Sequence, residues 1–350
     1  MMRDQMTPRE RYKAIAEGRP IDRIPHGFGL GEGAAKLIGI KVSEYCLEPK
    51  KQIEACVAAY RKYGLDSVGS FAGMTDIFGA KSVFPDYGTP YIGNTVQLTW
   101  DDLNRPYLEH PKTEPALRGF WDVLDGLNEA VGDEVRVNVS LEGPFSEAGR
   151  IIGVESLLKN IIRDPEYAHA VLSKVVETQI KLVDALEGYD LSFGIFDPVA
   201  SGTLINRSSY LEFAQPYEKK LFDAMTRVAG SKPMLHICGN TSKILKDMAA
   251  TGAGVLSIDN VMDLTFVKQE VGDIIPITGN VKPAETMLLG TPQDVENDLR
   301  ECLRKAWDSP AGYTPSFGCG LPIETPAENL DALFDALRKY GKYPLNPELF

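Results

Sequence analysis

Short apolar strands alternate with amphipathic helices over most of the chain, from about residue 115 to residue 340. Such alternation is typical of parallel βαβ units, in which each helix returns the chain to begin the next strand. Strands are predicted at 136–140, 191–196, 233–236, 254–258, 274–278 and 313–316. Helices are predicted at 121–131, 153–187, 209–228, 242–250, 264–271, 292–306 and 326–340. This number of units in a chain of 350 residues favours an α/β fold of the (β/α)8 TIM-barrel type.

A doubly wound open sheet is the alternative, but it usually carries a glycine-rich phosphate loop after an early strand, and none stands out here. The N-terminal third has a different pattern. Thr7 is expected to cap a first helix, 51–63 has helical periodicity up to Gly64, and the region around 91–95 favours a hairpin. We therefore expect one barrel domain over residues 1–350, with an N-terminal helical and β-hairpin extension over about 1–110.

Two glycine-flanked segments at predicted strand ends carry metal-binding side chains. One holds His236 and Cys238, and the other holds Cys319 between Gly318 and Gly320. The strand ends of a barrel meet at one rim, so these three side chains are expected to converge. One imidazole and two thiolates form the ligand set of a catalytic zinc with an open fourth position. Because the thiolates cancel the charge of Zn²⁺, such a centre suits holding a thiolate nucleophile.

Other polar residues follow predicted strands and are expected at the same rim. We predict catalytic roles for Asp197, Asp259 and Asn280, and substrate contacts for His26, Glu142 and Arg207.

Each of these residues also has a structural alternative. Asp197 and Glu142 can serve as ordinary turn residues, and Asn280 can occupy a tight turn. Asp259 can cap the next helix, act as a fourth metal ligand, or anchor His236. His26 and Arg207 can be structural or surface residues.

Composition excludes several classes of function. The formal net charge of −12 disfavours a nucleic-acid partner, and no apolar run is long enough for a membrane span. The charged N-terminus does not match a secretory signal. Five irregularly spaced cysteines do not form a disulfide framework, so a cytoplasmic location is expected. Cys46, Cys56 and Cys302 are expected to pack in helices or at their ends.

Six segments carry a resemblance to a known superfamily. They are TPRERYKAIAEGRPIDRIP, FDPVASGTLINRSSYLEFAQPYEKKL, MLHICGNTSKIL, VLSIDNVMDL, ITGNVKPAETMLLGTPQDVENDLREC and FGCGLPIETPAENLDAL. The chain resembles the uroporphyrinogen decarboxylase superfamily, and within it the zinc-dependent, corrinoid-linked methyltransferase branch whose known members methylate coenzyme M. The resemblance implies a (β/α)8 barrel, zinc on His236, Cys238 and Cys319, and an acidic residue near the metal at Asp259.

The same comparison argues against the founding decarboxylase activity. Those enzymes use an arginine-rich motif after the first strand, whereas residues 26–36 contain no arginine. The leading hypothesis is methyl transfer, in either direction, between a corrinoid and a small-molecule thiol or methylated compound. Asp-x-His-x-x-Gly is absent, so the corrinoid is expected on a partner protein. A metal-free carboxy-lyase using Asp197 and a non-catalytic zinc or corrinoid-partner protein are the alternatives, and a homodimer is compatible with the sequence.

Overall fold

Seven parallel strands form the central sheet in this computed structural model, which describes residues 4–350. Neighbouring strands in the sheet follow one another in chain order, apart from a separate hairpin. A doubly wound sheet would reverse its strand order at one point, so the barrel prediction is confirmed over the open-sheet alternative. The strands are β1 Val68–Phe71, β4 Val137–Glu142, β5 Leu191–Phe196, β6 Met234–His236, β7 Val255–Ser257, β8 Ile277–Thr278 and β9 Tyr313–Thr314.

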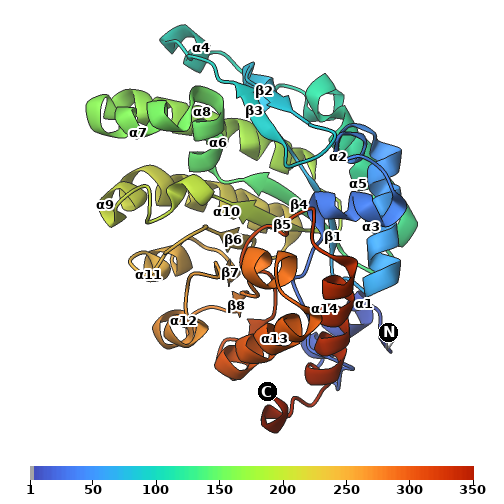
Figure 1. The fold of residues 1–350 in the computed structure, drawn as a ribbon. Coiled ribbons are helices and arrows are strands. Elements are labelled where there is room, and N and C mark those ends of the chain that lie inside the picture. The colour runs from blue at the N-terminus through green and yellow to red at the C-terminus, as the bar shows by residue number, and fades with distance from the viewer. Residues whose placement is uncertain (1–3) are drawn as a thin grey trace.

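Helices surround these strands on the outside (Figure 1). The N-terminal helices are α1 Pro8–Ala16, α2 Val42–Leu47, α3 Pro49–Tyr63, α4 Trp100–Asn104 and α5 Arg118–Val131. Those between β4 and β6 are α6 Pro144–Ile152, α7 Val154–Arg163, α8 Pro165–Ala185, α9 Arg207–Ser209 and α10 Gln215–Ala229. The last four are α11 Leu245–Ala249, α12 Leu264–Val271, α13 Pro292–Ala306 and α14 Ala327–Tyr340. Helices α12 and α13 match their predicted bounds.

One predicted helix is wrong in its extent. The single helix expected over 153–187 is divided into α7 and α8, because Asp164 and Pro165 start a new helix. Proline has no amide hydrogen for the preceding turn, and the Asp164 side chain accepts the amide of Tyr167 as an N-cap. Helix α6, which directly follows β4, was not predicted.

The strands alternate between a face toward the helices and a face toward the barrel axis. Leu141, Ile195 and Leu235 are fully buried and pack toward the helices. Their neighbours Glu142 and His236 point the other way, since successive side chains on a strand face opposite sides. Glu142 pairs in register with Phe196, and Phe196 with His236, so these three side chains form one interior layer.

The N-terminal segment fills the space between the first and last strands. The amide of Gly27 donates to the carbonyl of Pro315 at 2.9 Å, beside β9. On the other side, the amide of His26 donates to Asp66, just before β1, at 2.8 Å. Residues 24–28 therefore bridge the gap between β9 and β1 without forming a strand, and the N- and C-terminal parts of the chain lie side by side (Figure 1).

Part of the predicted N-terminal extension belongs to the main sheet, because β1 pairs with β4. The single barrel domain over residues 1–350 stays a prediction. The expected hairpin is present as β2 Lys81–Val83 and β3 Tyr91–Asn94, and Thr7 caps α1 through a capping box with Glu10. Residues 1–3 lie outside the described structure. Over residues 4–350, no helix has both the length and the apolar character that a membrane crossing requires.

Candidate metal centre

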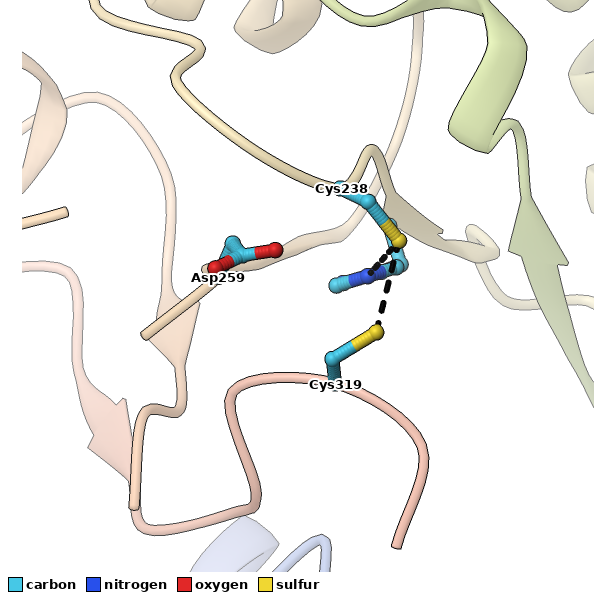
Figure 2. Close-up of side chains that lie close together, drawn as sticks. Cys238, Asp259 and Cys319 are labelled. Carbon is cyan, nitrogen blue, oxygen red and sulfur yellow. Dashed lines mark hydrogen bonds between the residues drawn. The ribbon is translucent and has the colours of Figure 1, made fainter. Parts of the chain in front are cut away.

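Four metal-competent side chains meet at the carboxyl end of the barrel. One potential ligand atom from each of His236, Cys238, Asp259 and Cys319 lies within 4.8 Å of the other three. The Cys238 and Cys319 sulfurs are 3.4 Å apart, and the Nε2 atom of His236 is 3.1 Å from the Cys238 sulfur. Figure 2 shows Cys238 and Cys319 pointing toward each other from two loops, with Asp259 beside them. The structure thus brings together the three predicted ligands.

The distances within this group fit a zinc ion. Tetrahedral Zn²⁺ with ordinary bond lengths separates two sulfur ligands by about 3.8 Å, and a sulfur from a nitrogen by about 3.5 Å. The sulfur–sulfur and sulfur–nitrogen separations in this structure are a few tenths of an ångström shorter, a difference that small side-chain rotations would remove. Both cysteines are free and partly exposed, so the group is open on one side.

The two thiols differ in acidity because they share a hydrogen bond. That bond from Cys238, together with the imidazole of His236, lowers the pKa of Cys319 to about 4. The same bond, with burial, raises the pKa of Cys238 well above its ordinary value. Both thiols must be deprotonated to bind a metal ion, so metal binding here would release protons.

Ser257 holds the His236 ring in place. The His236 Nδ1 atom lies 3.0 Å from the Ser257 hydroxyl, which leaves Nε2 facing the sulfurs. A hydrogen bond to the second ring nitrogen is the usual way to orient a metal-binding imidazole. Asp259 was one predicted anchor for His236, but Ser257 has this contact. The contact between Ser257 and His236 follows from strand pairing, because the two residues are register partners in β7 and β6. It can be predicted only after these strands have been aligned.

Asp259 instead fixes the turn that carries Cys238. Its carboxylate accepts the amide of Gly239 at 2.7 Å and the amide of Val261 at 2.9 Å. Gly239 has a φ of +78°, a left-handed conformation that glycine adopts without strain. The Ser201 hydroxyl donates to the carbonyl of Cys238 at 2.7 Å from the other side. These contacts set the direction in which the Cys238 thiol points.

The loop bearing Cys319 is locked against the loop after β7. A Cβ atom added to Gly318 would lie 2.4 Å from the backbone nitrogen of Asn260. Only glycine allows this approach, so the two loops are in direct backbone contact. Asn280 supports the same region, because its amide donates to the carbonyls of Asp259 and Met262 at 3.0 and 2.7 Å. The structure gives Asn280 positioning contacts, and its predicted catalytic role stays a prediction.

Glu142 was predicted to lie in the loop after a strand, but it is the last residue of β4. Its Oε1 atom accepts from Arg150 at 3.1 Å, and its side chain is 12% exposed. Nearby on α6, Glu147 accepts from the Thr75 hydroxyl at 2.9 Å. Burial raises the pKa of Glu142 to about 8 and that of Glu147 to about 7.

Asp197 is fully buried and serves the start of α6. Its carboxylate accepts the amide and the hydroxyl of Ser146 at 2.7 and 2.6 Å, and the amide of Phe145 at 3.3 Å. Burial raises the pKa of Asp197 to about 6, against these hydrogen bonds, which lower it.

Arg207, at the start of α9, is more than half exposed and makes two hydrogen bonds to Asp247, at 2.6 and 2.8 Å. The predicted roles of Asp197 in catalysis and Arg207 in substrate binding stay predictions.

His26 lies in a buried ionic cluster beneath the barrel wall. Its ring contacts the Gly64 carbonyl through Nε2 at 3.3 Å and the Phe28 amide through Nδ1 at 3.1 Å. Beside it, Asp66 pairs with Arg11 and Arg23, and all of these side chains are at most 3% exposed. Burial lowers the pKa of His26 to about 4, although Asp66 opposes this shift. The contacts of His26 are with buried groups that hold the fold together. They match the structural role that was the alternative to a substrate contact on the rim.

The His26 environment predicts acid-sensitive stability. Between pH 6.5 and about 4 the unfolded chain protonates this imidazole while the folded chain does not, so stability falls as the pH falls. The loss across this window is about 3 kcal/mol from this residue. Urea unfolding of wild type and H26Q at pH 7, 5.5 and 4.5 measures it. The stability gap between the two proteins should change with pH, and a constant gap would contradict the assignment.

Comparisons with known proteins agree over almost the whole length. The family model described as uroporphyrinogen decarboxylase (URO-D) matches residues 7–340. The methylcobamide:CoM methyltransferase MtbA of Methanosarcina mazei is 34% identical over 346 residues, covering 96% of this chain and 99% of that protein. The methylated-thiol–coenzyme M methyltransferase of the same organism is 27% identical over 351 residues, covering 97% and 91%. A solved methyltransferase structure from Methanosarcina mazei has a TM-score of 0.79 at 24% identity, covers 96% of this chain and 99% of its own, and shows the same fold.

Proposed function

Since this chain belongs to the uroporphyrinogen decarboxylase family, we propose that it is a zinc-dependent methyltransferase of that family rather than a decarboxylase. It would move a methyl group between a corrinoid on a partner protein and a small molecule, either a thiol or a methylated compound. The observation that carries this proposal is the convergence of His236, Cys238 and Cys319 at one open point of the barrel mouth. Two relatives whose names describe methyl transfer to coenzyme M support it.

Each residue of the site has a defined part in this proposal. His236, Cys238 and Cys319 would hold the zinc, which when bound acts as a Lewis acid toward the sulfur or oxygen of the substrate. Ser257 orients the imidazole, and Asp259 with Ser201 orients the Cys238 turn. An ion held by two thiolates and one imidazole carries little net charge. It therefore favours a bound thiolate over a bound hydroxide.

The corrinoid is assigned to a second polypeptide because the chain lacks the Asp-x-His-x-x-Gly motif. The partner would present its methyl group over the carboxyl end of the barrel, where the metal group is partly exposed. In one direction the substrate thiolate receives the methyl group. In the other, a methylated substrate gives it up.

Metal analysis combined with a methyl-transfer assay tests the proposal. The purified protein should contain about one zinc per chain, since the three proposed ligands belong to one group of side chains. It should demethylate methylcobalamin with at least one of a panel of small thiols, followed by the visible spectrum of the cobalamin. C46S is the matched control for variants that lack Cys238 or Cys319, because Cys46 is also a free, partly exposed cysteine but lies in α2. A protein with reduced thiols, no zinc and no turnover with any thiol would contradict the proposal and favour the metal-free lyase.

A further inference from the structure

Glu142 faces the same interior space as the predicted zinc ligand His236. The two residues lie two strands apart in one register layer, with Phe196 between them on β5. Strands in a sheet are spaced about 4.8 Å apart, so the two backbones are separated by about 10 Å. The rings of Phe196 and His236 are 5.9 Å apart, so these register partners project from the same side of the sheet, and Glu142 pairs with Phe196 on that side. A small molecule bound at the metal would therefore lie on the same side of the sheet as Glu142.

One carboxylate oxygen of Glu142 has no partner within the described chain. The Oε1 atom accepts from Arg150, but Oε2 is buried and has no hydrogen-bond partner among residues 4–350. Leaving a buried polar atom unsatisfied costs about 1–3 kcal/mol, so such atoms call for an explanation. The Glu147 carboxylate on the adjoining helix, by contrast, is hydrogen-bonded to Thr75. The orphaned oxygen at the metal end of the barrel points to a ligand as its missing partner.

Burial favours the neutral form of Glu142 near neutral pH. Burial raises its pKa to about 8, with Glu147 and Asp197 raising it further and Arg150 opposing them. A proton-transfer group works best when its pKa lies near the working pH, since both forms are then accessible. In its neutral form the acid can donate a proton from Oε2, and in its charged form it can accept one there.

We propose that Glu142 exchanges a proton with the sulfur or oxygen atom of the substrate that binds the metal. This role rests on the proposed function. In the thiol-methylating direction, the S–H bond breaks and the proton moves to Oε2 of Glu142. The electron pair left on sulfur forms the S–CH₃ bond, while the Co–CH₃ bond of the partner's corrinoid breaks and leaves its electron pair on cobalt. In the demethylating direction, the cobalt electron pair forms the Co–CH₃ bond, the S–CH₃ or O–CH₃ bond breaks with its pair on the heteroatom, and the heteroatom takes the proton from Glu142. Glu142 is thus a catalytic residue, while Arg150 is a positioning residue that fixes its carboxylate.

The pH dependence of methyl transfer tests this role. Transfer from methylcobalamin to 2-mercaptoethanol by zinc-loaded wild type, E142Q and E147Q is followed from pH 6 to pH 10. Wild type and the matched control E147Q should both show a rise in rate near pH 8, where Glu142 becomes ionised and can accept the proton. E142Q should lack this rise, and its kcat at pH 9 should fall about 10²–10⁴-fold with little change in KM.

A second measurement does not depend on the variant folding. An infrared titration of the zinc-loaded wild-type protein should show a protonated carboxylic acid that ionises near pH 8. Zinc-dependent methyl transfer with the same pH profile in wild type and E142Q, or no acid that ionises in this range, overturns the role of Glu142 and leaves the proposed function standing. Methyl transfer that is identical with and without zinc overturns the proposed function and this role with it.

Discussion

The C238A/C319A variant is expected to retain no zinc and to lose methyl transfer by at least about 10³-fold. Lewis-acid stabilisation by a bound metal contributes several kcal/mol, and each 1.36 kcal/mol is a factor of ten in rate. The two sulfurs are 3.4 Å apart, so removing both takes away two of the three proposed ligands and leaves His236. Elemental analysis and the methylcobalamin assay measure the two effects. The fold should persist, because both side chains lie at the partly exposed end of the barrel.

A graded variant separates loss of the metal from general damage. S257A removes only the hydroxyl that contacts Nδ1 of His236. Loss of such an orienting contact typically lowers metal affinity by about 10–100-fold, so this variant should bind zinc weakly but measurably in a chelator competition. Full zinc content in C238A/C319A would show that the metal is held elsewhere.

The D66N variant is expected to lose about 3–5 kcal/mol of folding free energy. Removing one partner from a buried ion pair leaves the other charge uncompensated, which is far more costly than losing an exposed pair. Asp66 accepts from Arg11 and Arg23 and from the amide of His26, and it is itself buried. These groups join the N-terminal segment to the wall beside β1. Urea unfolding at pH 7 measures the change.

Asp190 provides the matched control for Asp66. It also pairs with two arginines, Arg9 and Arg136, but its side chain is 58% exposed. Exposed pairs contribute about 0–1 kcal/mol, so D190N should change stability by no more than that. Equal losses in D66N and D190N would contradict the claim that burial makes the Asp66 cluster important.

Elements were predicted well where hydrophobic periodicity and the residues that start or end a helix agree. Helices α12 and α13 have both a regular apolar face and clear start signals, Asp263 and Thr291, and their bounds were predicted correctly. β1 was missed because Val68–Phe71 is short and only half buried, and it lies among irregular segments. Its membership in the main sheet comes from pairing with β4, about seventy residues away, which no local pattern contains.

The site residues also divide into those that the sequence reveals and those that only the fold reveals. His236, Cys238 and Cys319 were identified because their residue types are rare in this chain and chemically specific. Ser257 and Ser201 were not, because a serine gives no signal until the fold places it beside an imidazole or a carbonyl. Asp197 was predicted as catalytic from its place after a strand, but position alone does not reveal that the amides of α6 occupy its carboxylate.

The segment 24–28 hydrogen-bonds on one of its two sides to residues near the other end of the chain. A ribosome makes the N-terminal part first, so this segment reaches its full set of partners only after β9 and the residues that follow it have been synthesised. Cys319 emerges at the same late stage, whereas His236 and Cys238 are made much earlier. Under the proposed function, a chain that ends before Cys319 would therefore carry an incomplete ligand set and hold zinc poorly. Zinc binding would then distinguish finished chains from prematurely terminated ones.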